Sequence, residues 1–136
     1  MTAVALDTNA YTAFRKGFPD AVEMLAMVDH IVMPAVVLGE LRAGFAIGSR
    51  TTINERDLAR FLASSRVDVQ TIDERTSFVY GSVFMQLRKQ GMPIPTNDIW
   101  IAAAALVAGT PLFTFDAHFA HIDQLVPVAR WADLLQ

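Results

Sequence analysis

The chain has 136 residues, a formal net charge of −3 and no cysteine. The length corresponds to about one domain, so we expect a single domain over residues 1–136, and the lack of cysteine excludes a disulfide framework, a thiolate zinc site and a cysteine nucleophile. Hydrophobic residues make up 53% of the chain and charged residues 18%, which excludes a disordered chain, while the isoelectric point of about 5.5 argues against a simple basic nucleic-acid-binding protein.

Short apolar runs alternate with longer segments that carry helix start and stop residues. Gly17 lies just past the first predicted helix, Pro19 fits the first turn of the second, and Thr52 and Glu55 have the spacing of a capping box that opens a later helix. In chain order, the pattern predicts a strand at 4–6, helices at 8–16 and 20–29, a strand at 31–33, helices at 35–48 and from 52 to about 65, a strand at 67–72, helices at 74–90 and 97–108, strands at 112–115 and 126–129, and a short closing helix.

The helix at 97–108 is apolar almost all round, which predicts that it is buried. Its apolar run from Ile99 to Ala108 is the longest in the chain and is shorter than the roughly 20 residues that a membrane span needs. Asp7 comes too early for a signal peptide. We therefore expect a cytoplasmic protein without a membrane segment, and the high apolar content suggests that a partner covers part of its surface.

Strands that alternate with helices predict an α/β fold in which a parallel sheet has helices on both faces. The carboxyl ends of parallel strands lie at one edge of the sheet, and ligands bind beside that edge. Asp7 follows the first predicted strand, Asp116 follows the fourth, and Asp98 lies in the first turn of the buried helix. These three carboxylates are therefore candidates for one site.

Glu40 is a fourth candidate. On its helix it shares a face with Val36, Ala43, Gly44 and Ile47, so we expect its side chain to point along an apolar stripe. A carboxylate in that position is costly unless it is paired or bound to a cation.

Each acid also has an ordinary structural interpretation, such as a helix cap, a turn residue or a solvated side chain. Together, four acids without a neighbouring lysine in sequence would repel one another, and hard cations such as Mg²⁺ or Mn²⁺ would relieve that repulsion. Thr8, Asn9 and Thr114 are candidates for orienting these carboxylates or metal-bound waters. Thr114 lies two residues before Asp116, which places both side chains on the same face of the predicted strand.

Four segments resemble the PIN-domain ribonucleases, and closely the VapC-type toxins of prokaryotic toxin–antitoxin pairs. The segments are Val4-Ala5-Leu6-Asp7-Thr8-Asn9, Leu38-Gly39-Glu40-Leu41-Arg42-Ala43-Gly44, Asn97-Asp98-Ile99-Trp100-Ile101-Ala102-Ala103 and Phe113-Thr114-Phe115-Asp116-Ala117-His118-Phe119. They keep the order and approximate spacing of the family over nearly the whole chain.

The resemblance implies a three-layer α/β/α sandwich with a central parallel sheet of about five strands. It also implies that Asp7, Glu40, Asp98 and Asp116 hold Mg²⁺ or Mn²⁺ for hydrolysis of RNA, often tRNA or rRNA. It further implies a VapB-type antitoxin that blocks the acidic pocket, and a toxin homodimer. In the family pattern His118 lies beside the acidic turn and looks structural.

Substrate contacts are expected from basic side chains on the rim of the pocket, since the acids repel phosphate until a metal is bound. Arg15 (with Lys16), Arg42 and Arg50 are the candidates. The alternatives are a nuclease of RNA maturation without an antitoxin, a nuclease acting on DNA, a module that binds metal without catalysis, and a phosphoacceptor receiver domain. The last needs a lysine at a strand end near the acids, and both lysines lie near the C-terminal ends of predicted helices.

Overall fold

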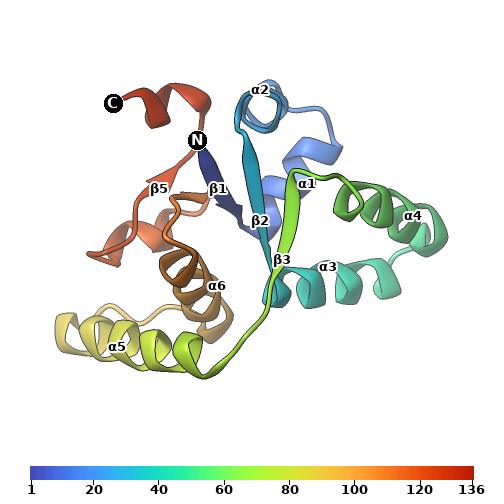
Figure 1. The fold of residues 1–136 in the computed structure, drawn as a ribbon. Helices are drawn as coiled ribbons and strands as arrows, with labels where there is room; N and C mark the ends of the chain where they lie inside the picture. Colours follow the sequence, from blue (N-terminus) through green and yellow to red (C-terminus); the bar gives the residue numbers. More distant parts are fainter.

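A five-stranded parallel sheet forms the centre of the structure, a computed structural model that describes residues 1–136 (Figure 1). The strand order is β3-β2-β1-β4-β5, and every neighbouring pair is parallel. This order confirms the predicted parallel sheet of about five strands. The strands are β1 (Ala3–Leu6), β2 (His30–Pro34), β3 (Val67–Gln70), β4 (Leu112–Phe113) and β5 (Pro127–Val128).

Helices cover both faces of this sheet, which confirms the predicted three-layer sandwich. Figure 1 shows α5 and α6 on one side of the sheet and α1 and α4 on the other. None of the helices is long and apolar enough to cross a lipid bilayer. The helices are α1 (Thr8–Arg15), α2 (Pro19–Met27), α3 (Ala35–Ile47), α4 (Thr51–Leu62), α5 (Glu74–Gln90) and α6 (Thr96–Ala108), with 3₁₀ helices η1 (Ala117–His121) and η2 (Trp131–Leu135) near the C-terminus.

Helix α6 is buried between α5 and the sheet, as its apolar sequence predicts. Ile99 and residues 101–105 of this helix are buried. Residues 102–105 are all alanine, and their small side chains let the helix backbone lie close to β1 and β2. Gly109 ends the helix with a φ of 71°, a left-handed conformation that glycine adopts without steric cost. This packing fixes the N-terminal turn of α6, which carries Asp98, against the carboxyl edge of the sheet.

The strand order places a topological switch point between β1 and β4. From β1 the chain moves outward to β2 and β3, and then returns to the other side of β1 to form β4 and β5. The backbone N–H of Asp7 donates to the carbonyl oxygen of Phe113 at 3.0 Å, so the chain segments that leave β1 and β4 start side by side. Open parallel sheets bind ligands at this kind of position.

The predicted capping box at Thr52 and Glu55 is wrong. Helix α4 begins at Thr51, whose hydroxyl donates to the carbonyl oxygen of Phe45 at 2.6 Å, and Glu55 pairs with Arg42 at 3.3 Å. No side chain caps the start of α4, and Glu55 lies in an exposed ion pair instead.

Strand β4 is shorter than the predicted strand at 112–115. The N–H of Phe115 donates to the side-chain oxygen of Asn9, and the N–H of Asp116 donates to the Thr114 hydroxyl. These bonds turn the chain out of the sheet into η1, which the sequence analysis did not predict. A turn therefore brings Thr114 and Asp116 together, and the prediction that their side chains share one face of a strand is wrong.

Candidate metal-binding and catalytic site

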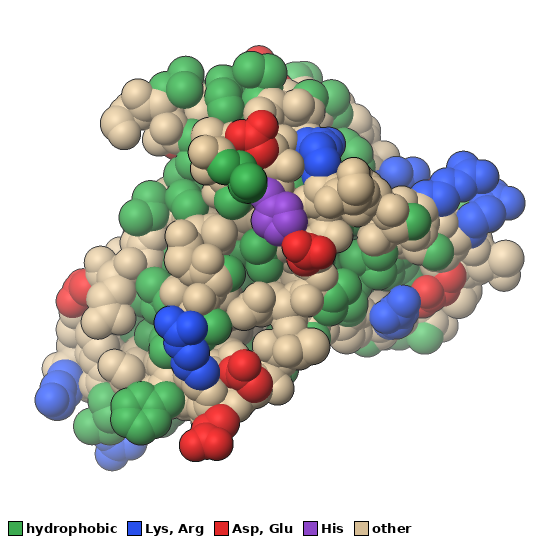
Figure 2. Space-filling view, in the orientation of Figure 1, with side chains coloured by type: hydrophobic (Ala, Val, Ile, Leu, Met, Phe, Trp, Pro, Cys, Tyr) green, Lys and Arg blue, Asp and Glu red, His purple; other side chains and the backbone are tan.

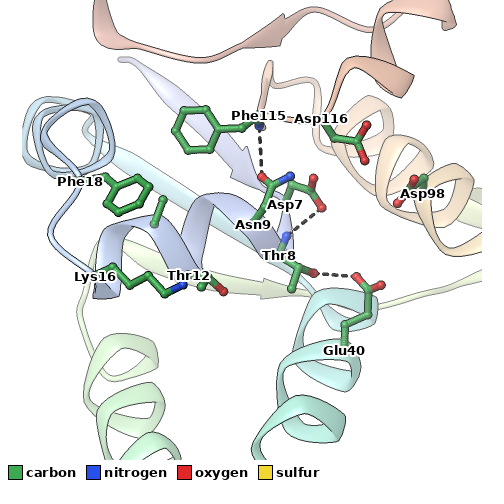
Figure 3. A pocket seen from close by; sticks show the side chains of 11 residues that line it. Asp7, Thr8, Asn9, Thr12, Lys16, Phe18, Glu40, Asp98, Phe115 and Asp116 are labelled. Atoms are coloured by element: carbon green, nitrogen blue, oxygen red, sulfur yellow. Dashed lines mark hydrogen bonds between the residues drawn. The ribbon is translucent and has the colours of Figure 1, made fainter.

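A pocket of about 640 Å³ opens at the carboxyl edge of the sheet, at the switch point between β1 and β4. All four predicted acids line it, and they come from four separate parts of the chain (Figure 3). Its lining residues are Asp7, Thr8, Asn9, Thr12, Ala13, Lys16, Phe18, Glu40, Asp98, Phe115 and Asp116.

Asp7 is the most buried of the four acids, with 4% of its surface exposed. One carboxylate oxygen accepts from the N–H of Thr8 at 2.7 Å and so caps α1, and the other accepts from the Thr114 hydroxyl at 2.7 Å. Burial raises the pKa of Asp7 from 3.8 to about 6, and the charges of Asp98 and Glu40 add to this rise, although both hydrogen bonds oppose it. The folded chain therefore keeps the Asp7 carboxylate in surroundings that disfavour its negative charge.

Glu40 reaches the pocket from α3 and is held by hydrogen bonds from two other elements. Its carboxylate accepts from the Thr8 hydroxyl at 2.6 Å and from the side-chain amide of Asn97 at 3.5 Å. Because the Thr8 N–H is bonded to Asp7, Thr8 links two of the four acids. Asn97 is a contact that the sequence analysis did not single out, although it directly precedes Asp98.

The apolar stripe that was expected beside Glu40 is not buried. Ala43, Gly44 and Ile47 are exposed, Ile47 to 89%, and α3 buries Val37 and Leu41 instead. Glu40 was therefore placed in the site for the wrong reason. Its orientation depends on hydrogen bonds from Thr8 and Asn97, which helical periodicity does not reveal.

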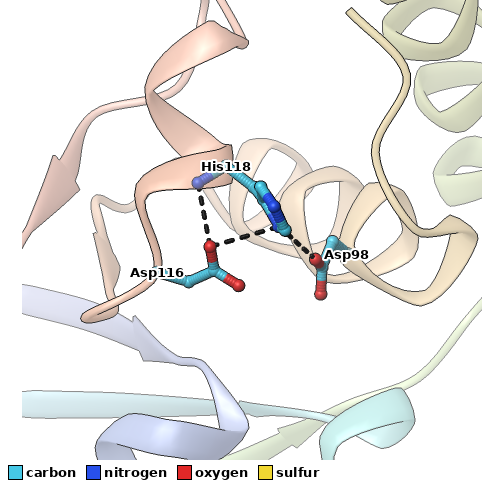
Figure 4. Close-up of side chains that lie close together, drawn as sticks. All are labelled: Asp98, Asp116 and His118. Atoms are coloured by element: carbon cyan, nitrogen blue, oxygen red, sulfur yellow. Dashed lines mark hydrogen bonds and ion pairs between the residues drawn. The ribbon is translucent and has the colours of Figure 1, made fainter.

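Asp98, Asp116 and His118 form the tightest group in the site (Figure 4). One ligand atom from each lies within 4.8 Å of the others, and the His118 Nδ1 atom lies 3.2 Å from Asp116 and 3.6 Å from Asp98. Burial raises the pKa of Asp98, and the charge of Asp116 raises it further. His118 was expected beside the acidic turn, and its imidazole nitrogen lies close to both acids.

This donor set fits a hard divalent cation. The acids offer carboxylate oxygens, the ligands that Mg²⁺ and Mn²⁺ prefer, and the pocket holds four of these acids and a single lysine, Lys16. No ion pair joins Lys16 to any of the acids, and Figure 3 shows it at the opposite end of the pocket from Asp98 and Asp116. A bound cation would offset the unfavourable charge of the buried Asp7.

The three predicted orienting residues have different roles. Thr114 is buried, and its hydroxyl donates to Asp7 while accepting from the N–H of Asp116. Thr8 contacts two acids, as predicted. Asn9 contacts none of them, because its side-chain oxygen accepts from the N–H of Phe115 at 3.1 Å and so holds the turn after β4.

The three predicted RNA-contacting arginines do not line the acidic pocket. Arg15 pairs with Asp57 at 3.0 Å, Arg42 pairs with Glu55, and Arg50 borders a second cavity. Lys16 does line the pocket, but it lies at the C-terminal end of α1 and not at a strand end, as expected from the sequence. The strand order also excludes the receiver-domain alternative, since that fold has the order 2-1-3-4-5 and this sheet has the order 3-2-1-4-5.

Comparison with known proteins agrees with the resemblance found in the sequence. The model of the PIN domain family matches residues 4–125. The chain belongs to the PIN domain family. Its relatives include Ribonuclease VapC1 of Haemophilus influenzae, which is 34% identical over 94% of this chain and 95% of that protein, and Ribonuclease VapC5 of Mycobacterium tuberculosis, which is 27% identical over 89% and 88%. The predicted membership among the VapC-type PIN proteins is thereby confirmed.

Solved structures of PIN-domain proteins have the same fold. The VapBC2 complex of Rickettsia felis, bound to a DNA fragment from its promoter, contains a chain with a TM-score of 0.83 and 26% identity, which covers 93% of this chain and 98% of its own. A chain of the VapBC-1 complex of nontypeable Haemophilus influenzae gives a TM-score of 0.81 and 29% identity over 93% and 97%.

Replacing Thr114 with valine is expected to reduce RNA cleavage about 10- to 100-fold, the usual effect of losing a residue that orients a metal ligand. Valine has a similar shape but removes the hydroxyl bonded to Asp7 and to the N–H of Asp116. The loss of these partners is expected to cost about 1–3 kcal/mol of stability. Cleavage kinetics and urea unfolding measure the two effects. Thr114→Ser keeps the hydroxyl and is expected to retain most of the activity.

Proposed function

We propose that this chain is a divalent-metal-dependent endoribonuclease, the toxin of a toxin–antitoxin pair, and that Asp7, Glu40, Asp98 and Asp116 form its active site. The observation that carries this proposal is the convergence of four carboxylates from four chain segments on one pocket, one of them buried without a cationic partner. Related proteins named ribonucleases, which match nearly the whole chain, support the choice of RNA as substrate.

Asp7, Asp98 and Asp116 would hold Mg²⁺ or Mn²⁺, with Glu40 directly or through water. When bound, such an ion lowers the pKa of a water molecule and polarises a phosphoryl oxygen. Glu40, whose carboxylate is oriented by Thr8 and Asn97, would accept a proton from the attacking water.

His118 keeps Asp98 and Asp116 close together, since its ring nitrogen lies within 3.6 Å of both. The Thr114 hydroxyl likewise joins Asp7 to the turn that carries Asp116. These contacts come from η1 and from the turn after β4, so the acids keep their arrangement before RNA arrives.

A protein partner is supported by apolar surface next to the pocket. Phe18, Val22 and Met27 on and before α2 are 54%, 42% and 51% exposed, and Phe18 also lines the acidic pocket. A VapB-type antitoxin that covers Phe18 would reach the acids directly. Solved VapBC complexes with a chain of the same fold are consistent with such a partner. We also expect the toxin to form a homodimer.

The proposal is tested by incubating total cellular RNA and matched DNA with the purified chain, in Mg²⁺, in Mn²⁺ and in EDTA. Discrete cuts in RNA alone that disappear with EDTA and with Asp98→Asn would support a metal-dependent endoribonuclease and identify its target. Cuts in DNA would favour the DNA nuclease. No cleavage by a folded, antitoxin-free sample would favour a module that binds metal without catalysis.

The toxin role is tested in cells. Induction of the wild-type chain is expected to stop growth, while the Asp98→Asn variant does not, and co-expression of a short open reading frame found next to this one is expected to restore growth. Cleavage in vitro without growth arrest, and without such a reading frame, would favour a nuclease of RNA maturation.

Adding Mg²⁺ or Mn²⁺ is expected to raise the Tm of the wild-type chain, because a ligand that binds only the folded state stabilises it by about 2.7 kcal/mol at 100 times its Kd. The shift is expected to grow as the pH rises towards about 6 and then level off, since protonated Asp7 is a poor metal ligand. Scanning calorimetry with and without metal at several pH values measures this. An equal shift in Asp98→Asn would contradict binding at this pocket.

A further inference from the structure

A second cavity of about 480 Å³ lies beside the acidic pocket, between α1, α3 and α4. Thr12 and Lys16 line both cavities, so the second one continues directly from the first. Its volume falls within the range of about 300–1,000 Å³ that is common for pockets that bind a small organic group. Nothing in the proposed reaction so far uses this cavity.

The cavity contains a buried polar group without a partner. Tyr11 lines the cavity and is 2% exposed, and its hydroxyl makes no hydrogen bond. The ion pair of Arg15 and Asp57 lines the same cavity. Burial raises the pKa of Tyr11, while Arg15 lowers it and Asp57 raises it further. Buried hydroxyls are normally hydrogen-bonded, and this one has no partner within the protein.

The charge of this cavity is opposite to that of the acidic pocket. Arg15, Lys16 and Arg50 line it together with a single acid, Asp57, which is already paired with Arg15. Lys16 and Arg50 form no ion pair with any acid of the chain. Figure 2 shows further Lys and Arg side chains gathered over α4, which forms one wall of the cavity. The surroundings therefore favour an anion.

The remaining walls are apolar and include an aromatic ring. Phe45 from α3 and Ile53 from α4 line the cavity, and both are partly accessible. A ring beside cationic groups suits a nucleotide of single-stranded RNA, whose base stacks on aromatic side chains while Lys and Arg contact the backbone.

We propose that this cavity binds the nucleotide next to the scissile phosphate of the RNA, an inference that rests on the proposed endoribonuclease function. The base lies against Phe45, and its polar edge pairs with the Tyr11 hydroxyl. The adjoining phosphates contact Lys16 and Arg50. Lys16 borders both cavities. It therefore lies where the RNA strand passes from this nucleotide to the four acids.

The test measures binding of a short fluorescein-labelled single-stranded RNA to chains that also carry Asp98→Asn and so do not cleave it. Phe45→Ala is expected to weaken binding about 10-fold or more. The slope of the logarithm of the binding constant against the logarithm of the salt concentration is expected to stay the same. Arg50→Gln is expected to weaken binding and to reduce that slope by about 0.7, the value for one phosphate contact on a single strand. Tyr11→Phe is expected to weaken binding while raising the Tm, because it removes an unpaired buried hydroxyl.

Two control variants test whether misfolding or the loss of any positive charge explains weaker binding. Phe45→Leu keeps the apolar bulk but removes the aromatic face, so it is expected to fold normally and still bind weakly. Arg88→Gln, on α5 and away from the cavity, removes one positive charge and is expected to leave affinity unchanged. In the cleaving background, Phe45→Leu is expected to raise KM more than it lowers kcat.

Unchanged RNA affinity in Phe45→Leu, Arg50→Gln and Tyr11→Phe would overturn the inference, even if the wild-type chain cleaves RNA. Loss of antitoxin binding in these variants with unchanged RNA affinity would also overturn it and assign the cavity to the protein partner. RNA binding that depends on these residues, in a chain that cleaves no RNA, would support the nucleotide cavity and contradict the proposed catalysis.

Discussion

Replacing Asp7 with asparagine is expected to abolish RNA cleavage and, at the same time, to raise the Tm of the chain at neutral pH. Asparagine keeps the size of the side chain and an oxygen that can accept from the Thr8 N–H, but it carries no charge and is a weaker ligand for a hard cation. Most single substitutions lower the stability of a protein. A higher Tm together with a loss of cleavage would show that the charge of Asp7 destabilises the folded chain and is needed for activity.

The expected gain follows from the pKa of Asp7, which rises from 3.8 to about 6 when the chain folds. Between these values the folded chain binds more protons than the unfolded chain, so the free energy of unfolding falls as the pH rises. Above pH 6 the charged carboxylate destabilises the folded state by about 3 kcal/mol, at about 1.4 kcal/mol per pKa unit. The Tm of the variant is therefore expected to lie several degrees above that of the wild type at pH 7. Near pH 4 the two Tm values are expected to be nearly equal.

Calorimetry of both proteins across this pH range, without divalent metal, measures the difference. Asp29→Asn is the matched control, because hydrogen bonds from Thr2 lower the pKa of Asp29. That substitution is expected to lower the Tm at pH 7 and to leave cleavage unchanged. A Tm of Asp7→Asn below that of the wild type at pH 7 would show that the charge of Asp7 is not the source of the strain.

Asp7, Asp98 and Asp116 could be predicted because their positions depend on chain order. An acid directly after an apolar strand of a parallel sheet lies at the carboxyl edge, and an acid in the first turn of a buried helix lies at one end of that helix. Both rules need only the identity of the elements and not their precise ends. The structure brings all three acids into one pocket, even though β4 is shorter than predicted.

The contacts that hold the acids could not be predicted, because they join residues far apart in sequence. The bond between Thr114 and Asp7 spans 107 positions, and the one between Asn97 and Glu40 spans 57. The turn after Phe113 likewise depends on Asn9, which lies 106 residues from Phe115. Of the basic residues proposed for RNA contact, only Lys16 lines the acidic pocket, since the sequence does not reveal which side of α1 faces it.

Replacing Phe113 with alanine is expected to have the largest effect on stability, about 3–5 kcal/mol, the usual cost of truncating a buried phenylalanine. Phe113 is fully buried, and its ring lies 5.3 Å from that of Phe115 in an edge-on arrangement. Domains of this size are stable by about 5–15 kcal/mol in total. Urea unfolding followed by circular dichroism measures the loss.

Cleavage is expected to fall as well, even in the fraction that remains folded, because β4 has only two residues and fixes the position of the site. Phe113 lies opposite Leu6 in the sheet, and its carbonyl oxygen accepts from the N–H of Asp7. A cavity beside this pair loosens the register that places the Thr114 hydroxyl against the Asp7 carboxylate. Phe78→Ala removes an equally large ring that is 84% exposed on α5, and it is expected to change neither stability nor cleavage. Equal effects of the two substitutions would show that the burial of Phe113 does not position the site.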